Sequence, residues 1–157
     1  MPLSACITVD DNDRRLVADV CDGSVRYVRG VAHYSRLAEV VIDVPADDCD
    51  REMAFWSAAT GQPLTQLDDH PEYHRAKLPG RAFGLLIQRL VDGLGRLHLD
   101  VHTDDLDAEV SRLEKLGAER VQRVQAWWIM RDPAGLLFCV VPKPAGSFHD
   151  GNAQRWE

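Results

Sequence analysis

VVIDVPADD at residues 40–48 and LHLDVHTDD at residues 97–105 decide the fold, because they are two versions of one pattern. Each reads as an apolar strand that carries an Asp in its middle and ends in a double Asp. A helical pattern follows each copy and stops at a glycine, Gly61 in the first copy and Gly117 in the second. A glycine just past a helix supplies the left-handed conformation that ends it. The chain therefore carries an internal repeat.

Three further strands are expected after each helix. The first copy has PLTQLDD and EYHRAKL, which flank an expected turn at His70-Pro71, and closes on GLLIQRL at 84–90. The second copy has ERVQRV and AWWIMR, then a type I turn at 132–135, and closes on GLLFCVV at 135–141. The sequence therefore predicts an α+β fold made of two tandem βαβββ modules.

The second helix is the better specified of the two. Asp104 or Asp105 is placed to cap it, and acidic side chains in its first turn suit the helix dipole. Its apolar residues recur at spacings of four and three, which predicts one buried face: Leu106, Val110, Leu113 and Leu116. The first helix is expected to bury Met53 and either Phe55 or Trp56.

The repeat divides the chain into three parts. Residues 37–142 form the predicted domain, with modules at about 37–91 and 95–142. Residues 1–36 precede it as an extension in which SVRYVRG reads as a strand and ACITVD as a second candidate strand. Residues 143–157 are polar and contain Gly and Pro, so we expect a tail that runs over the surface.

The composition excludes some classes of partner. The chain has 157 residues, of which 45% are hydrophobic, and a formal net charge of -7. Nucleic acids and anionic membranes need a basic face, so we expect neither as a partner. No apolar run approaches the length of a membrane span, and the first residues do not resemble a secretory signal. The sequence therefore predicts a cytoplasmic protein.

Alternation along the strands predicts which side chains face a cleft. Leu97, Leu99 and Val101 share one side of their strand and suit packing under a helix, whereas His98 and Asp100 share the other. One of the two adjacent tryptophans should line the cleft, and we take Trp128. Applied to all strands, the alternation predicts these ligand-binding residues: Val41, Leu86, Gln88, His98, Asp100 and Trp128.

The repeat resembles the vicinal oxygen chelate superfamily, in particular its glyoxalase-like and bleomycin-resistance-like members. The motifs that carry the resemblance are H-L-D-V, D-D-L-D-A-E-V, L-G-A and D-P-x-G in the second copy, with VVIDVPADD and GLLIQRL in the first. The resemblance implies a curled, mostly antiparallel sheet around a cleft between the modules, with the helices outside. It also implies a homodimer, and a divalent metal in some members but not in others.

The resemblance also locates the metal ligands of the metal-binding members. The corresponding positions here are Val41, Gln88, His98 and Cys139, of which only His98 is a usual ligand. Val41 cannot bind a metal, Gln88 is a weak oxygen donor, and Cys139 stands where a carboxylate is expected. A set of His98, Cys139 and Gln88 suits zinc better than the hard, oxygen-seeking ions.

Two classes of function remain open. One is a binding protein that holds a small apolar or aromatic molecule in the cleft, with a degenerate metal site and no certain cofactor. The other is a divalent-metal-dependent lyase, isomerase or dioxygenase in which a metal such as zinc polarises oxygen atoms of the substrate. We favour the binding protein because the predicted metal set is incomplete, and the fold alone does not decide between them.

Overall fold

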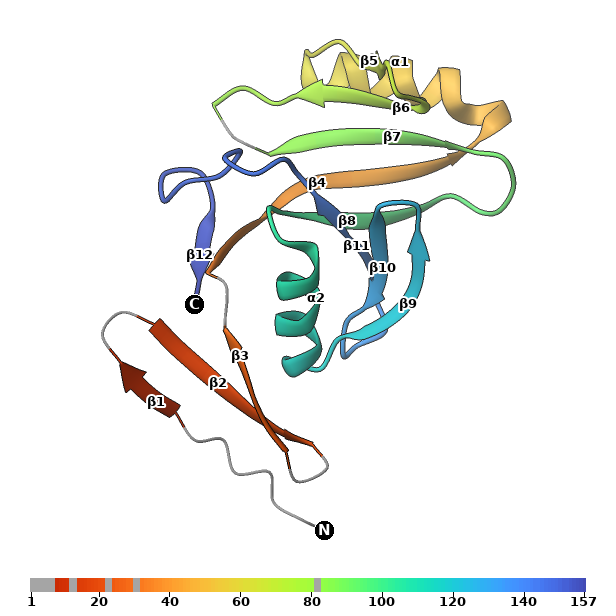
Figure 1. The fold of residues 1–157 in the computed structure, drawn as a ribbon. Coiled ribbons are helices and arrows are strands. Elements are labelled where there is room, and N and C mark those ends of the chain that lie inside the picture. Colours follow the sequence, from red (N-terminus) through yellow and green to blue (C-terminus); the bar gives the residue numbers. More distant parts are fainter. Residues whose placement is uncertain (1–7, 12–13, 22–23, 30–31, 81–82) are drawn as a thin grey trace.

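The computed structural model describes residues 8–11, 14–21, 24–29, 32–80 and 83–157 (Figure 1). The predicted repeat is confirmed. Its first copy contains β4 (His33–Pro45), the short 3₁₀ helix η1 (Ala46–Asp48), α1 (Cys49–Thr60), β5 (Thr65–Leu67), β6 (His70–Lys77) and β7 (Gly84–Leu90). Its second copy contains β8 (Arg96–Thr103), α2 (Leu106–Lys115), β9 (Glu119–Val124), β10 (Trp127–Arg131) and β11 (Leu137–Pro142).

The two copies join through their first strands into one mixed sheet. The strand order is β5-β6-β7-β4-β8-β11-β10-β9, and β4 and β8 pair antiparallel. Within each copy the first and last strands pair parallel, and the remaining pairs are antiparallel. The sheet stays open, and Figure 1 shows β6 and β7 running across the view while β9 and β10 run nearly upright. The predicted curled α+β sheet is therefore confirmed.

The predicted glycines at the ends of both helices and the predicted cap at the start of α2 are confirmed. Gly61 has φ 66° and Gly117 has φ 98°, so both glycines take the left-handed conformation that ends each helix. The Asp105 side chain accepts a hydrogen bond from the backbone N–H of Ala108 at 3.0 Å and caps α2. Leu116 is 65% exposed because it lies beyond the last turn of α2, so its predicted burial is wrong.

Two apolar clusters lie between the helices and the sheet. Under α2, the cluster consists of Val110, Met130, Phe138 and Val140, with Leu99, Val101, Leu106, Leu113, Ala118 and Trp128 against it. Under α1, it consists of Val44, Cys49 and Ile87, with Ile42, Met53, Leu64 and Trp56 against it. Phe55 is exposed, so Trp56 is the aromatic residue that the first helix packs inward. The face of the sheet that the helices leave free holds the site described below.

The N-terminal extension contains a separate three-stranded antiparallel sheet of β1 (Thr8–Asp11), β2 (Arg14–Cys21) and β3 (Ser24–Arg29). SVRYVRG is therefore a strand over its described residues, and ACITVD is one from Thr8 onward; the rest of each stretch lies outside the described residues. Arg14–Cys21 was not predicted.

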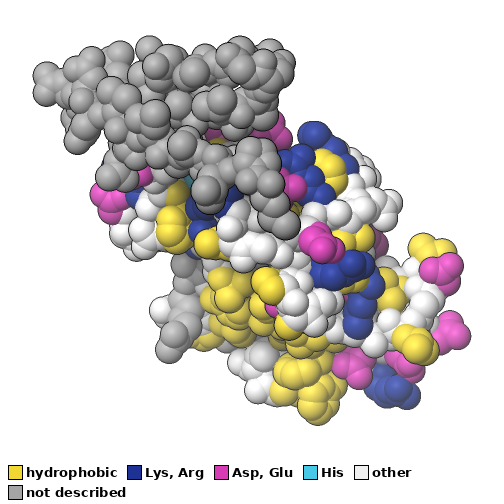
Figure 2. All heavy atoms as spheres, turned by 90° about the horizontal axis from the view of Figure 1, so that it is seen from below, with side chains coloured by type: hydrophobic (Ala, Val, Ile, Leu, Met, Phe, Trp, Pro, Cys, Tyr) yellow, Lys and Arg dark blue, Asp and Glu magenta, His cyan; other side chains and the backbone are white. Residues whose placement is uncertain are grey.

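On the face seen in Figure 2, hydrophobic side chains gather beside basic and acidic ones. Neither described helix is long and apolar enough to cross a membrane.

The turn predicted at His70-Pro71 is wrong, because both residues belong to β6 and the chain turns at Asp68-Asp69 instead. His70 pairs with Leu67 across this two-residue turn. Pro71 is tolerated because it lies where the register between β5 and β6 shifts and has no paired residue on β5 or β7.

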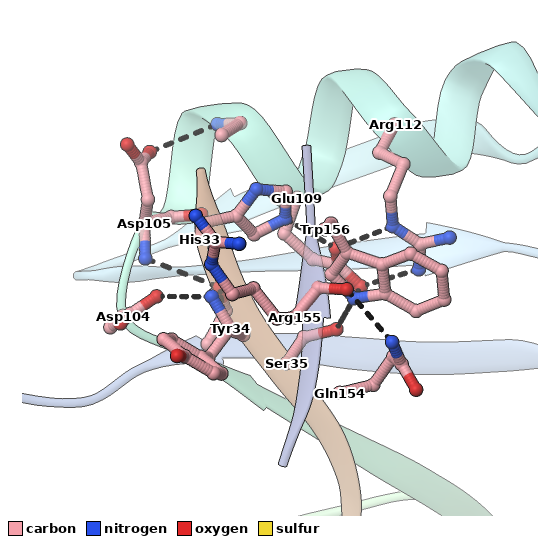
Figure 3. Close-up of polar contacts among 12 residues, drawn as sticks. His33, Tyr34, Ser35, Asp104, Asp105, Glu109, Arg112, Gln154, Arg155 and Trp156 are labelled. Atoms are coloured by element: carbon pink, nitrogen blue, oxygen red, sulfur yellow. Dashed lines mark hydrogen bonds and ion pairs between the residues drawn. The ribbon is translucent and has the colours of Figure 1, made fainter. Parts of the chain in front are cut away.

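The C-terminal tail was expected only to run over the surface, but its end is a strand. β12 (Gln154–Trp156) pairs antiparallel with the first residues of β4, where β7 does not reach. Figure 3 shows how a buried carboxylate anchors this region: Glu109 on α2 contacts His33, Ser35 and Arg112. Trp156 donates to Ser35 Oγ at 2.8 Å and stacks on the Arg112 guanidinium at 3.8 Å. The tail is thereby fixed to both β4 and α2.

Candidate functional site

A cavity of about 280 Å³ lies on the helix-free face of the sheet and takes residues from both copies of the repeat. Four of its residues come from the central strands β4 and β8, and others come from β6, β7, β10 and β11. The lining residues are Glu39, Leu67, His70, Tyr73, Leu86, His98, Asp100, His102, Gln125, Ala126, Trp127, Cys139, Val141, Pro142 and Lys143. Aromatic side chains and ionisable groups thus meet in one small space.

The structure brings some of the predicted site residues together and leaves others outside. Leu86, His98, Asp100 and Cys139 line the cavity. Val41, Gln88 and Trp128 do not. Val41 is fully buried beside His98 in the sheet, and Gln88 lies next to Asp43 one strand further out. Trp128 pairs with Val140 and therefore shares the face that packs under α2, so Trp127 is the tryptophan at the cavity.

Strand register explains why His98, Asp100 and Cys139 lie close together. Asp100 on β8 pairs with Glu39 on β4 and with Cys139 on β11, so all three share one row across the sheet. His98 lies on the same face, two residues before Asp100. The donor atoms of His98, Asp100 and Cys139 lie within 4.8 Å of one another.

Asp43 orients His98 by contacting the ring nitrogen that points away from the cavity. Its buried Oδ2 atom accepts from Arg96 Nε at 2.6 Å and lies 3.2 Å from His98 Nδ1. Burial alone would raise the pKa of Asp43, but the contacts with His98 and Arg96 outweigh burial and lower it below its ordinary value. A charged Asp43 bound to Nδ1 leaves His98 Nε2 directed to the cavity, 3.6 Å from Asp100 Oδ1.

Asp100 is the most perturbed carboxyl group at the cavity. Burial raises its pKa to about 6, with His98 opposing the rise and Glu39 adding to it. Its Oδ1 atom is buried and has no hydrogen-bond partner among the described residues. Burial and the neighbouring Asp100 carboxylate raise the pKa of the Cys139 thiol to about 12. Within the described part of the chain, Asp43 Oδ1 and Asp100 Oδ1 are both buried acceptors without a donor, and of these two residues Asp100 lines the cavity.

These three side chains fit a zinc ion. They offer one nitrogen, one oxygen and one sulfur donor, a combination that zinc accepts and that magnesium or calcium does not favour. Asp100 Oδ1, buried without a partner, supplies the oxygen donor. Asp43 behind His98 is the second carboxylate that often orients a ligating imidazole.

A second group of possible ligands, Glu39, Asp100 and His102, does not suit a cation. Arg75 already holds Glu39 Oε1 at 2.6 Å. Burial, together with the charges of Lys143, Arg36 and Arg75, lowers the pKa of His102 to about 3, so this imidazole is neutral at physiological pH. A metal ion placed here would meet the same positive charges.

Two local features create this basic end of the cavity. A bulge in β4 between Leu37 and Glu39 shifts the register, so that Arg36 pairs with His102 and turns to the cavity face. Gly84 on β7 leaves room for Arg75 to reach across to Glu39. A Cβ atom there would lie 3.2 Å from both Arg75 Nε and Glu39 Oε1. Strict alternation predicts neither feature.

The mouth of the cavity is aromatic. His70 meets Trp127 edge to face with ring centroids 6.0 Å apart, and it meets Tyr73 in the same way. Gln125, in the two-residue turn between β9 and β10, has φ 49°, an uncommon conformation for a residue other than glycine. The contact between His70 on β6 and Trp127 at the start of β10 thus joins the two copies at the cavity.

The residues that sequence reasoning missed include Glu39, His70, Tyr73, Trp127 and Lys143. Glu39 lies two residues before Val41 and was within reach of the alternation argument. His70 and Tyr73 were obscured by the misplaced turn, and Lys143 was assigned to the tail. The cavity lies about one pleat nearer than expected to the C-terminal ends of β8 and β11.

Comparison with known proteins agrees with this geometry. The glyoxalase-like domain family matches residues 39–141. Methylmalonyl-CoA epimerase from Mycobacterium tuberculosis superposes with a TM-score of 0.51 at 23% identity, over 69% of this chain and 87% of that one. No curated protein sequence matches this chain at a significant level.

Two larger enzymes share the fold. The Mn(II)-bound glyoxalase from Novosphingobium aromaticivorans gives a TM-score of 0.51 at 19% identity, over 71% of this chain and 40% of that one. The 2,2',3-trihydroxybiphenyl 1,2-dioxygenase from Sphingomonas wittichii gives 0.50 at 17% identity, over 71% and 42%. The superposed part of this chain therefore covers less than half of either enzyme. The match of the family model to residues 39–141, about two thirds of the chain, shows that this chain belongs to the glyoxalase-like domain family.

Proposed function

We propose that this chain binds a small organic molecule in the cavity between its two repeats. The observation that carries the proposal is Asp100 Oδ1, a buried carboxylate oxygen that lacks a donor in a cavity lined by aromatic side chains. Trp127 and Tyr73 offer apolar surface to a ring or a short chain, and Asp100 offers an acceptor to its hydroxyl or amine. A volume of about 280 Å³ suits a ligand of roughly one ring with its substituents.

Fragment binding followed by amide NMR shifts tests this proposal. We expect fragments from a panel of small aromatic acids, amides and alcohols to give saturable shifts at Trp127 and His98. Ala126 is exposed and lines the cavity, so Ala126→Trp should narrow the mouth and weaken binding by about tenfold or more. Ala134→Trp, at an exposed turn outside the cavity lining, is the matched control and should leave binding unchanged. If fragments bind Ala126→Trp as tightly as the unaltered chain, the cavity is not the binding site.

The second candidate function is a divalent-metal-dependent lyase, isomerase or dioxygenase. The convergence of His98, Asp100 and Cys139 within 4.8 Å favours it. A zinc ion held there would supply a Lewis acid that polarises a substrate oxygen. His98, oriented by Asp43, and Asp100 would then position that substrate.

Metal analysis of protein purified without an affinity tag separates the two candidates. The metalloenzyme requires one ion per chain, which His98→Ala should remove because only two of the three donors then remain. An ion content near zero, with unfolding unaffected by a chelator, would support the metal-free binding protein. A stoichiometric ion that is lost in His98→Ala would support the metalloenzyme instead.

The proposal also includes a homodimer, as the resemblance in the sequence implies, and a cytoplasmic location. Val91 and Leu94, in the link between the two copies, are 100% and 89% exposed. Fully exposed large apolar side chains of this kind support a contact with another protein surface. A monomeric mass in light scattering would remove the dimer from the proposal.

A further inference from the structure

The cavity has two ends of different charge. At one end lie His98, Asp100 and Cys139, where the partnerless oxygen is an acceptor. At the other end lie Glu39, His102 and Lys143, at the ends of β8 and β11 and the start of the tail. The second end is where the structure gathers cationic side chains that the proposed function has not yet used.

Three positive side chains act at this end. Arg75 is bound to Glu39 at 2.6 Å, and its Nε atom is buried without a hydrogen-bond partner among the described residues. Arg36 lies over the Phe148 ring at 5.4 Å and donates to the backbone of Asn152, and its Nε is likewise buried and without a partner. Both guanidinium groups are therefore held in place with donor capacity left over.

Lys143 is the positive group that reaches the cavity itself. Its backbone N–H donates to Thr103 O at 2.7 Å, which fixes the start of the tail against the end of β8. Its side chain is half-buried, lines the cavity and forms no ion pair within the described part of the chain. Burial lowers the pKa of Lys143, and Arg75 and Arg36 add to this against the opposing pull of Glu39.

The charges at this end do not cancel. Arg75 already holds Glu39 Oε1, so the two carboxylates at this end, Glu39 and Asp100, face three cationic side chains, and Lys143 forms no ion pair within the described residues. Half-buried cations without a counter-ion are costly, and an anion that enters the cavity would relieve this cost. A metal ion would increase it.

We propose that the Lys143 end of the cavity recognises an anionic group, so that the ligand is a small organic acid, carboxylate or phosphate, whose body contacts Trp127. This proposal rests on the proposed function, because it names the class of ligand for the same cavity. The anion lies at Lys143, supported by Arg36 and Arg75. The far end of the ligand lies toward Asp100 and carries a hydrogen-bond donor. Carboxylates and phosphates share this chemistry.

Three matched probes test the proposal on the full-length chain: benzoate, phenyl phosphate and benzamide, each titrated with amide NMR shifts as the readout. We expect at least one of the two anions to bind about tenfold or more tightly than neutral benzamide. The stronger of the two anions identifies the group as carboxylate or phosphate. Lys143→Gln should remove that preference by weakening the binding of the anions, without lowering the melting temperature. Lys115 is an exposed lysine at the end of α2, and Lys115→Gln should leave both the anion preference and benzamide binding unchanged.

Two outcomes would overturn the proposal. One is benzamide bound as tightly as both anions, and the other is a preference that persists in Lys143→Gln. In either case the cavity does not recognise an anion through this end. If benzamide still shifts Trp127 in that result, the proposed function stands alone. If none of the three probes shifts any residue of the cavity, the proposed function fails together with the anion site.

Discussion

Glu109→Ala is expected to lower the free energy of unfolding by about 3–5 kcal/mol, the usual range for removing one partner of a buried ion pair. Glu109 is fully buried. It accepts two hydrogen bonds from Arg112, at 2.8 Å each, and one from Ser35 at 2.9 Å, and it contacts His33 at 2.8 Å. Alanine would leave these groups buried without their acceptor and would release β12 through Trp156.

Urea unfolding of Glu109→Ala against Glu114→Ala makes the comparison. Glu114 lies on the same helix and forms a surface ion pair with Arg120, so its loss should cost only about 0–1 kcal/mol. Burial alone would raise the pKa of Glu109, but Arg112, His33 and Ser35 hold it below its ordinary value. The stability that Glu109 contributes is therefore fully present above the pKa that Glu109 has in the unfolded chain. It is lost as the pH falls through the lower pKa that Glu109 has in the folded chain. Equal losses in both variants would show that this carboxylate does not anchor the tail.

Asp100→Asn is expected to make the metal-free chain more stable by about 3 kcal/mol at pH 8, although it removes a group from the site. Asp100 has a pKa of about 6 in the folded chain against an ordinary 3.8. The folded state therefore binds more protons than the unfolded state between these values. Stability falls as the pH rises through this window and stays lowered above it. Asn is neutral throughout and avoids this loss.

Urea unfolding at pH 4 and pH 8, in chelator, measures the effect. The difference between Asp100→Asn and the unaltered chain should be near zero at pH 4 and largest at pH 8. Asp92→Asn, at an exposed position in the link between the copies, should show no such dependence. A variant that is less stable at pH 8, or one whose effect is the same at both pH values, would contradict a strained carboxyl group at Asp100. A stability gain with weaker ligand binding is the trade-off expected of a functional residue.

Much of the fold is readable from the sequence because its signals are local and occur twice. The alternation in LHLDV gives the correct faces for Leu99 and Val101, which pack under α2, and for His98 and Asp100, which line the cavity. Leu97 is 53% exposed, so its predicted packing under a helix is wrong. The glycine that ends each helix and the cap at Asp105 follow from backbone chemistry. Each of these features depends on a few neighbouring residues.

The rest depends on contacts between distant segments. Either of two adjacent tryptophans satisfies the alternation of β10, and only its pairing with β11 places Trp127 at the cavity. The bulge before Glu39 and the missing side chain at Gly84 create the basic end, and neither leaves a pattern in one sequence. The pairing of β12 with β4 joins residues about 120 positions apart and has no local signal.

The most direct test of the central claim, that the cavity between the repeats binds a small molecule, is a crystal structure of the chain grown with the tightest-binding fragment of the panel. We expect the fragment in the cavity, with its ring against Trp127 and a donor within hydrogen-bond distance of Asp100 Oδ1. A fragment bound only outside the cavity, or the failure of every fragment to bind, would contradict it.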